Sequence, residues 1–242
     1  MFHGAKEKTI RRQLVILVVT RKLYSSTVLV LGIVQFVEAL AFFLPQSYFP
    51  MYITSLGASI ASVGIFVSAF TLASAVLSPV IGRLVDRIGR KRLILWGLAG
   101  DFVLGILTGL APTWQYLLII RFLNGAVSAA SILAAEALLI DSVPASRRGE
   151  AVGFTSACAM AGRWAGPIFG GTIQWVSRSF DFSLVNSYRI PYFVDSILAI
   201  FTLALVSWKT SESRTKTITY NTAPKAEKGK MKFTTSMLAS YK

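Results

Sequence analysis

The sequence predicts an all-α integral membrane protein with six transmembrane helices. Three observations support this fold class: the composition, six long apolar runs, and basic residues that gather on one side of those runs. The chain has 242 residues, of which 54% are hydrophobic, and its mean hydropathy is +0.60. A soluble domain of this size needs more polar residues to cover its surface.

Each of the six runs is long enough to cross a bilayer, which takes about 20 residues in a helix. We expect helices rather than barrel strands because the runs do not alternate apolar and polar residues, and because a helix satisfies its backbone hydrogen bonds internally. The runs are residues 26–45, 58–81, 93–110, 114–140, 151–176 and 190–208.

The runs divide the chain into three parts. Residues 1–25 are expected to form a cytoplasmic amino-terminal segment, whose short apolar patch suits an interfacial helix and is not followed by the cleavage site of a signal peptide. Residues 26–208 are expected to form the six-helix transmembrane bundle. Residues 209–242 are rich in Thr, Ser and Lys, which is typical of a polar basic cytoplasmic tail or a central linker.

Basic residues set the expected orientation. The chain has 25 Lys and Arg against 11 Asp and Glu, a net charge of +14, and cytoplasmic connections of membrane proteins carry the excess of Lys and Arg. Six basic residues precede the first run, five lie between the second and third, and two between the fourth and fifth, whereas the opposite side has only Arg178 and Arg189. We therefore expect a multi-pass protein of the cell membrane with both termini in the cytoplasm. Because the charge follows topology, nucleic acid is not an expected partner.

The sequence carries no recognisable catalytic or metal-binding cluster. It has one cysteine, Cys158, and one histidine, His3, which excludes an internal disulfide and a His/Cys metal site. A nucleophile–base constellation and a cofactor motif are also absent from the sequence. A membrane enzyme is therefore disfavoured, and neither a cofactor nor a metal is expected.

The connection between the second and third runs reads Gly-Arg-Leu-Val-Asp-Arg-Ile-Gly-Arg-Lys-Arg. It resembles the cytoplasmic signature of the major facilitator superfamily, with both glycines, the aspartate and the basic cluster at the family spacing. Glycines permit a tight turn between helices, and the aspartate can accept hydrogen bonds from a helix N-terminus and pair with arginine. A plain positively charged loop needs neither the glycines nor the aspartate. The signature residues are Gly82, Arg83, Asp86, Arg87, Gly89, Arg90, Lys91 and Arg92.

The fifth run contains a second motif, Gly-Arg-Trp-Ala-Gly-Pro-Ile-Phe-Gly-Gly. It resembles the glycine-proline signature of the superfamily's drug:proton antiporter branch. Small residues let two helix backbones approach, and a proline removes one backbone hydrogen bond, so such a helix can bend. The residues of this antiporter-type helix are Gly162, Gly166, Pro167, Gly170 and Gly171.

The fourth run contains Arg121 with a glycine four residues later, which is similar to the family's fourth-helix motif. Asn124 stands where the family usually has Gln, a mild departure. Further along, Asp141 precedes Arg147 and Arg148, an order that resembles the family's acidic-to-basic exit from this helix. Asp141 is therefore expected to pair with the arginine cluster of the signature.

Together these resemblances cover roughly residues 26 to 210 and imply one half of a major-facilitator-type fold. They imply a proton-coupled exporter of a small molecule that works by alternating access, with a cavity between two six-helix bundles. A second bundle, from a separate chain or a second copy, is then an expected partner beside membrane lipid and the substrate. A receptor or scaffold derived from a carrier, or a truncated inactive fragment, is the alternative.

Ionisable residues inside the runs are candidates for the site, because charges at membrane depth are costly without a partner, a watery cavity or a function. Glu38 and Arg121 are expected to form a proton-responsive pair in the cavity. Arg163 is expected to contact an anionic substrate or to pair with a carboxylate. A static structural ion pair is the alternative in each case.

Three further acidic residues are expected to be structural. Asp101 lies in the third run, which is peripheral in the family, so a structural hydrogen bond is the favoured role. Asp195 and Glu136 lie nearer the ends of their runs, where side chains that reach the interface, or a partner in a loop, account for them.

Overall fold

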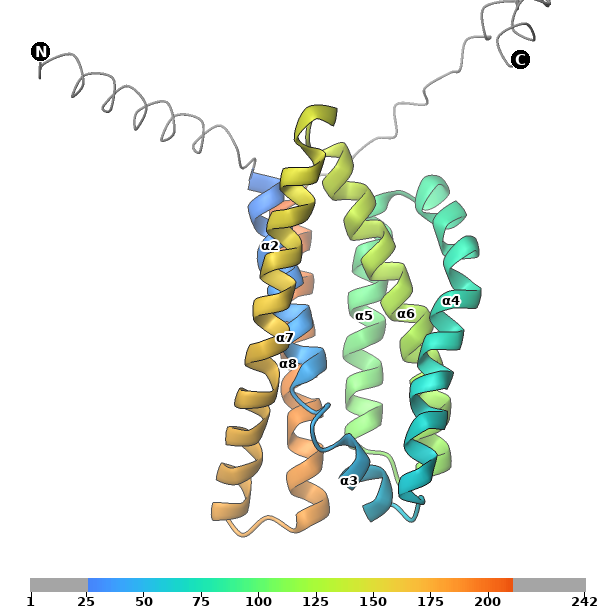
Figure 1. Cartoon of the computed structure of the whole chain (residues 1–242), viewed down its shortest axis with the longest axis vertical. Helices are drawn as coiled ribbons and strands as arrows, with labels where there is room; N and C mark the ends of the chain where they lie inside the picture. Colours follow the sequence, from blue (N-terminus) through green and yellow to red (C-terminus); the bar gives the residue numbers. More distant parts are fainter. Residues whose placement is uncertain (1–25, 211–242) are drawn as a thin grey trace, which may run out of the picture.

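The computed structural model describes residues 26–210, and all regular structure in this part is helical (Figure 1). Expectations for residues 1–25 and for the tail beyond residue 210 lie outside the described residues. The long helices run side by side along one axis (Figure 1). They are α2 (Ser26–Phe43), α4 (Val63–Ile88), α5 (Arg90–Gly109), α6 (Trp114–Asp141), α7 (Arg148–Ser179) and α8 (Leu184–Lys209).

Within the described residues, five helices are long and apolar enough to cross a membrane: α2, α4 with the short turn before it, α5, α6 and α8. The prediction of an all-helical chain with several membrane-crossing helices is confirmed. Helix α7 has 32 residues and runs beside α2 (Figure 1). Its glycines and charged residues make it less apolar than the other long helices.

Most helices extend beyond the apolar runs that predicted them. Helix α8 begins at Leu184 instead of residue 190, and α4 continues to Ile88 instead of ending at residue 81. Backbone hydrogen bonding does not stop where side chains become polar. Charged residues can remain helical because their long side chains extend the charged group to the membrane interface. The sequence therefore located the helices but misplaced their ends.

Three short helices lie in the connections: α3 (Phe49–Ser55), η1 (Ile60–Ser62) and η2 (Ala145–Arg147). Helix α3 was not predicted. It has seven residues with Pro50 in its first turn, a position that suits proline because the first N–H groups of a helix have no partner within it. Helix α3 lies at the end of the bundle opposite Ser26 (Figure 1). We refer to these two ends as the Ser26 end and the α3 end.

The long helices pack in two groups. Helix α2 packs against α7 and α8, helix α6 packs against α4 and α5, and a contact between α5 and α8 joins the groups. Glycine makes some of these contacts possible: a Cβ atom on Gly125 of α6 would collide with the backbone of Phe70 on α4. Close backbone approach of this kind is typical of membrane helices.

Two clusters of buried side chains occupy the two ends of the bundle. The cluster toward the Ser26 end is aliphatic, whereas the cluster toward the α3 end is rich in aromatic rings. The first includes Val28, Leu31, Val34, Ile81, Val85, Leu93, Ile94, Leu98, Leu138 and Val206. The second consists of Phe49, Tyr52, Ile53, Phe66, Ala111, Leu117, Tyr188 and Tyr192. The residues between these levels enclose a cavity.

Candidate functional site

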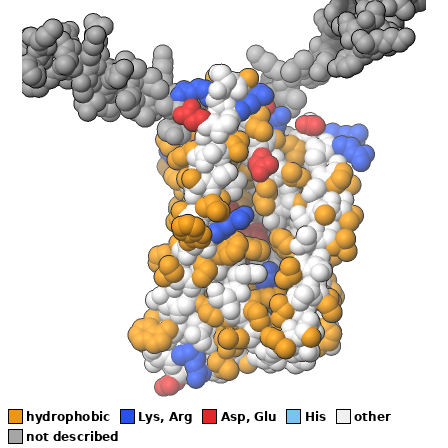
Figure 2. All heavy atoms as spheres, viewed as in Figure 1, with side chains coloured by type: hydrophobic (Ala, Val, Ile, Leu, Met, Phe, Trp, Pro, Cys, Tyr) orange, Lys and Arg blue, Asp and Glu red, His pale blue; other side chains and the backbone are white. Residues whose placement is uncertain are grey.

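A cavity of about 320 Å³ lies between the two buried clusters. Residues from α2, α4, α5, α6, α7 and α8 line it, and rings such as Phe42, Phe43 and Phe70 make part of its wall apolar. Figure 2 shows charged side chains recessed among apolar ones part-way along the bundle. The volume is within the range of pockets that bind small molecules.

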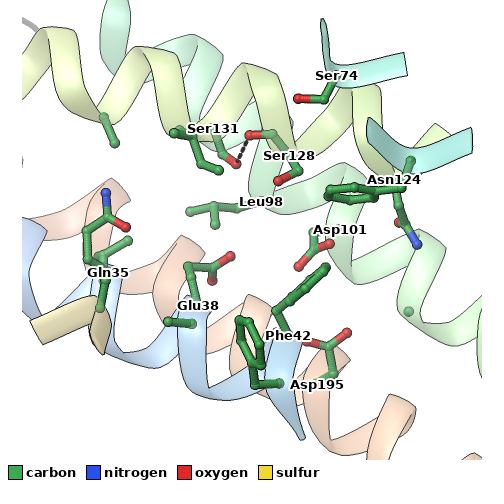
Figure 3. Close-up of a pocket in the computed structure, with 18 of the residues that line it drawn as sticks. Gln35, Glu38, Phe42, Ser74, Leu98, Asp101, Asn124, Ser128, Ser131 and Asp195 are labelled. Carbon is green, nitrogen blue, oxygen red and sulfur yellow. Dashed lines mark hydrogen bonds between the residues drawn. The ribbon is translucent and has the colours of Figure 1, made fainter. Parts of the chain in front are cut away.

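Three carboxyl groups from three helices meet in this cavity: Glu38 of α2, Asp101 of α5 and Asp195 of α8. Figure 3 shows Glu38 and Asp101 extending into the same space, with Asp195 beside them. Asp195 is within electrostatic range of both of the others. Counting about 1.5 Å per residue, each lies roughly 16 to 21 Å along its helix from the Ser26 end, so the three share one depth.

This arrangement corrects the expectations for Asp101 and Asp195. Asp101 is not peripheral, because α5 packs between α6 and α8 and its middle faces the interior. Asp195 is not near a helix end, because α8 starts at Leu184 and places it more than two turns inside. Glu136 is exposed in the last turns of α6, as expected.

Glu38 is held by a hydrogen bond across two helices. The hydroxyl of Thr202 on α8 donates to Glu38 Oε1 at 2.6 Å, and Thr202 is fully buried. A distance of this size is typical of an O–H donor to an ionised carboxylate. Sequence reasoning missed Thr202, although it is the one polar residue in the apolar stretch 197–206, which was a signal that its hydroxyl has a partner on another helix.

Arg121 is buried at the α3 side of the cavity. Its guanidinium carbon lies 4.0 Å from the centroid of the Phe49 ring, and it is within electrostatic range of Asp101 and Asp195. Its Nε and one terminal nitrogen have no acceptor in the described part of the chain. Buried donors are normally satisfied, so these N–H groups are available to a ligand or to water in the cavity.

The expected pairing of Glu38 with Arg121 is not made in this structure. Both residues line the cavity, but no ion pair joins them among the described residues. The physical reason is that Thr202 draws the Glu38 carboxyl toward α8, while Asp101 is a closer electrostatic neighbour of Arg121. The structure therefore brings the two predicted residues together in one cavity without a direct contact.

Arg163 lines the cavity from α7. Its guanidinium carbon lies 5.6 Å from the centroid of the Phe43 ring, within the range of a cation–π contact. The residue is exposed and makes no ion pair within residues 26–210. The expected pairing with a carboxylate is therefore not made among the described residues, and contact with an anionic substrate stays a prediction.

A band of neutral polar side chains faces the carboxyl groups. Asn124, Ser128 and Ser131 lie along α6, and Ser74 joins them from α4 (Figure 3). Ser131 donates a hydrogen bond to the Ser128 carbonyl at 3.1 Å. Sequence reasoning named Asn124 only as a departure from a motif. The spacing of 124, 128 and 131, which places three polar residues on one face of an apolar helix, was the signal for this wall.

The glycine-proline motif of α7 packs directly on α2. Cβ atoms added to Gly162, Gly166 or Gly170 would collide with the backbone or Cβ atoms of α2 and of Leu44 just after it. Gly171 points elsewhere, since a Cβ there would meet only the Tyr48 hydroxyl, at 3.7 Å. The helix continues through Pro167 without a break. Three of the four glycines thus form one stripe at a spacing of four residues, which holds the cavity wall of α7 against α2.

The signature surrounds the tight turn between α4 and α5. Gly89 is both the C-cap of α4 and the N-cap of α5, and its φ is +102°. Residues other than glycine rarely adopt this backbone conformation. Arg90 forms an ion pair with Asp141 at the end of α6, which is the pairing expected for Asp141. Lys91 donates hydrogen bonds to the carbonyls of Ser207 and Thr210 at the end of α8, at 2.7 and 2.5 Å.

Two signature residues differ from expectation. Gly82 lies inside α4 and not in the turn, and a Cβ there would meet open space. Asp86 is exposed, and no hydrogen bond or ion pair to it exists in the described part of the chain. The sequence places both in a compact loop motif, but α4 continues seven residues beyond the predicted end, so they lie on its outer surface. The remaining signature residues, Arg83, Arg87 and Arg92, are also exposed.

The family model of the Major Facilitator Superfamily matches residues 31–240. The chain belongs to the Major Facilitator Superfamily. The resemblance of its motifs is thereby confirmed, and with five helices able to cross a bilayer it is a multi-pass membrane protein.

Curated relatives align with this chain over part of their length. The multidrug export protein EmrB of Haemophilus influenzae is 28% identical over 192 residues, which are 79% of this chain and 36% of EmrB. The fatty acid resistance protein FarB of Neisseria gonorrhoeae is 29% identical over 74% of this chain and 33% of FarB. Multidrug resistance protein 1 of Bacillus subtilis is 34% identical over 64% of this chain and 39% of that protein. The chain therefore spans about a third to two fifths of the length of these relatives.

Solved structures share its fold. A bacterial homolog of the human lysosomal transporter Spinster, in an inward-facing and unoccupied conformation, has a TM-score of 0.67 at 19% identity and covers 77% of this chain and 43% of its own. The human organic anion transporter MFSD10 (TETRAN) has a TM-score of 0.64 at 17% identity, over 77% of this chain and 47% of its own. At these identities the likeness shows the fold alone.

Proposed function

We propose that this chain is the amino-terminal six-helix half of a secondary transporter that exports small molecules in exchange for protons. The observation that carries the proposal is the convergence of three carboxyl groups and two arginines on one cavity in the middle of the bundle. Charges at this depth are costly, and titratable carboxyl groups facing a cavity are suited to exchange a proton for a ligand.

Helix α7 is the sixth membrane span in this proposal. Its 32 residues are long enough to cross, and its glycine stripe keeps it against α2 over several turns. The Ser26 end faces the cytoplasm in this proposal, because the basic connections around Gly89 and Arg147 lie there. Among the described residues, the connections at the α3 end have only two basic residues, Arg178 and Arg189. Both termini are then cytoplasmic.

A second six-helix bundle completes the cavity. Exposed apolar residues such as Ile65, Leu72 and Val76 cover the outer face of α4, and exposed Asp86 and the open space at Gly82 lie on the same helix. If the chain is monomeric in lipid vesicles and still gives robust flux, this part of the proposal is wrong.

The substrate is a small molecule with apolar surface and a positive charge. Three carboxyl groups against two arginines favour a cation, and the ring-lined wall favours apolar groups. Relatives named as multidrug export and multidrug resistance proteins support export of a drug-like small molecule. In the proposed cycle Glu38 takes a proton when substrate leaves and releases it when substrate enters, while Arg121 presents its free N–H groups to the ligand.

The test is Glu38→Gln in vesicles that contain the assembled transporter, with ethidium and tetraphenylphosphonium as probes. We expect flux driven by a proton gradient to disappear while exchange of probe for probe survives, because the amide keeps the shape of the carboxyl group but cannot titrate. Glu136→Gln is the matched control, since Glu136 is exposed and lies outside the cavity. Unchanged proton-driven flux in Glu38→Gln would remove Glu38 from the mechanism.

A further inference from the structure

The hydroxyl of Thr202 lies between the carboxyl group of Glu38 and a backbone carbonyl of its own helix. Thr202 Oγ1 has two acceptors within reach: Glu38 Oε1 at 2.6 Å and the carbonyl of Ala199, in its own helix, at 3.0 Å. A hydroxyl has one hydrogen and can donate to only one of them at a time. The shorter distance indicates that the hydrogen goes to Glu38 in this structure.

We infer that Thr202 is the positioning residue for Glu38, and that its hydroxyl hydrogen changes acceptor when Glu38 gains a proton. With Glu38 ionised, Thr202 donates to the carboxylate. With Glu38 protonated, the new O–H of Glu38 donates to Thr202 Oγ1, and the Thr202 hydrogen turns to the Ala199 carbonyl. The only proton added is the one that Glu38 takes from the cavity, and each donor has an acceptor in both states.

Several charged groups lie near Glu38, but Thr202 makes the direct contact. The charged groups that face it are Asp101 from α5, Asp195 from α8 and Arg121 from α6, and Arg163 of α7 lines the same cavity. None of them makes an ion pair with Glu38 within residues 26–210. The hydroxyl of Thr202 is therefore the group that stabilises the ionised carboxyl by direct contact.

The position of Thr202 also fixes where the carboxyl group points. Thr202 is fully buried. In an α-helix a threonine hydroxyl can reach the backbone carbonyl of the residue three or four positions earlier. A second acceptor is thus built into α8 and needs no movement of the helix. The bond between α2 and α8 survives protonation with reversed direction, so Glu38 keeps its place in the cavity in both states.

An infrared titration of the full chain in lipid tests this inference. The carboxyl band that disappears in Glu38→Gln identifies the Glu38 signal, and its midpoint of proton uptake is then measured in Thr202→Val. We expect that midpoint to move to higher pH by about one unit, because the ionised form loses a charge-assisted hydrogen bond whereas the protonated form loses only a weaker neutral one. Thr202→Ser, which keeps the hydroxyl, is expected to restore the midpoint.

The control is Thr155→Val. Thr155 is buried in α7 and bonds to its own helix at the Ala151 carbonyl, at 3.2 Å, but has no carboxyl partner. It is expected to leave the midpoint unchanged. If Thr202→Val unfolds the chain, Thr202→Ala removes the hydroxyl with a smaller side chain. A midpoint equal to that of the unmodified chain in either variant overturns the inference, as does an equal shift in Thr155→Val.

The inference rests on Glu38 as the proton site, but the two proposals fail separately. The infrared measurement needs no flux, so a shifted midpoint in Thr202→Val with unchanged proton-driven flux in Glu38→Gln would leave the hydrogen-bond exchange intact and refute the transport role. Loss of flux in Glu38→Gln with no shift in Thr202→Val would do the reverse.

Discussion

The two ends of the bundle are closed by different chemistry. At the Ser26 end the buried cluster is aliphatic, and charged side chains around the Gly89 turn tie three helices together: Arg90 pairs with Asp141 of α6 and Lys91 binds the end of α8. At the α3 end the cluster is built from aromatic rings, and the tyrosine hydroxyl of Tyr52 and the guanidinium of Arg189 bond to backbone carbonyls.

Because the two ends are held by different interactions, opening them is expected to require different amounts of free energy. Aromatic side chains bury a large area and stack in specific geometries, whereas ion pairs that solvent reaches in part contribute little and weaken with salt. We therefore expect the α3 end to supply more of the folding stability and the Ser26 end to open more readily.

Removal of the central ring at the α3 end is expected to cost most. Tyr52 is fully buried, its ring lies 5.5 Å from that of Tyr192, and its hydroxyl donates to the Thr108 carbonyl at 2.8 Å. Tyr52→Ala should destabilise the chain by about 3–5 kcal/mol, as for other large buried aromatic residues. Thermal unfolding in lipid nanodiscs measures it, with Trp208→Ala as the control because Trp208 is 80% exposed. Equal losses in the two variants would contradict the contrast between the ends.

At the Ser26 end the ion pair of Arg90 with Asp141 is expected to contribute less. Asp141→Asn should cost about 1 kcal/mol, because the two side chains are 12% and 28% exposed and solvent screens their attraction. The loss should shrink at high salt. The exchanged double variant, Arg90→Asp with Asp141→Arg, should recover part of the stability. A salt-independent loss of several kcal/mol would show that this end is held as firmly as the other.

The sequence predicted the helices at this end better than the contacts of the signature. The tight turn at Gly89 and the pairing of Asp141 were predicted from residue types and family resemblance. The positions of Gly82 and Asp86 on the surface of α4 were not predicted, because the apolar run ends at residue 81 while the helix continues to Ile88. Hydropathy shows where side chains become polar, but the backbone hydrogen bonds of a helix can continue beyond that point.

The cavity was harder to predict for a related reason. Glu38, Arg121 and Arg163 were recognised because a charge in an apolar run is conspicuous. Asp195 was assigned to a helix end because its helix was drawn six residues too short. Thr202 and the band at Asn124 are neutral, so their importance appears only once α8 faces α2 and α6 faces the carboxyl groups. Which faces meet is a tertiary fact that a single sequence does not contain.

The smallest expected effect lies where α8 ends. Lys91 Nζ donates to the carbonyls of Ser207 and Thr210, which have no partner within the last turn of a helix, and a cation there also interacts favourably with the helix dipole. Lys91→Met should therefore cost about 0.3–1 kcal/mol. Global unfolding barely resolves so small a loss, but hydrogen exchange of the Thr210 amide, bonded to the Val206 carbonyl at 3.2 Å, should speed up. Arg92→Met is the matched control, because Arg92 is exposed in the same basic cluster. Faster exchange in both variants would mean that the net charge of the cluster, and not the two hydrogen bonds of Lys91, holds the end of α8.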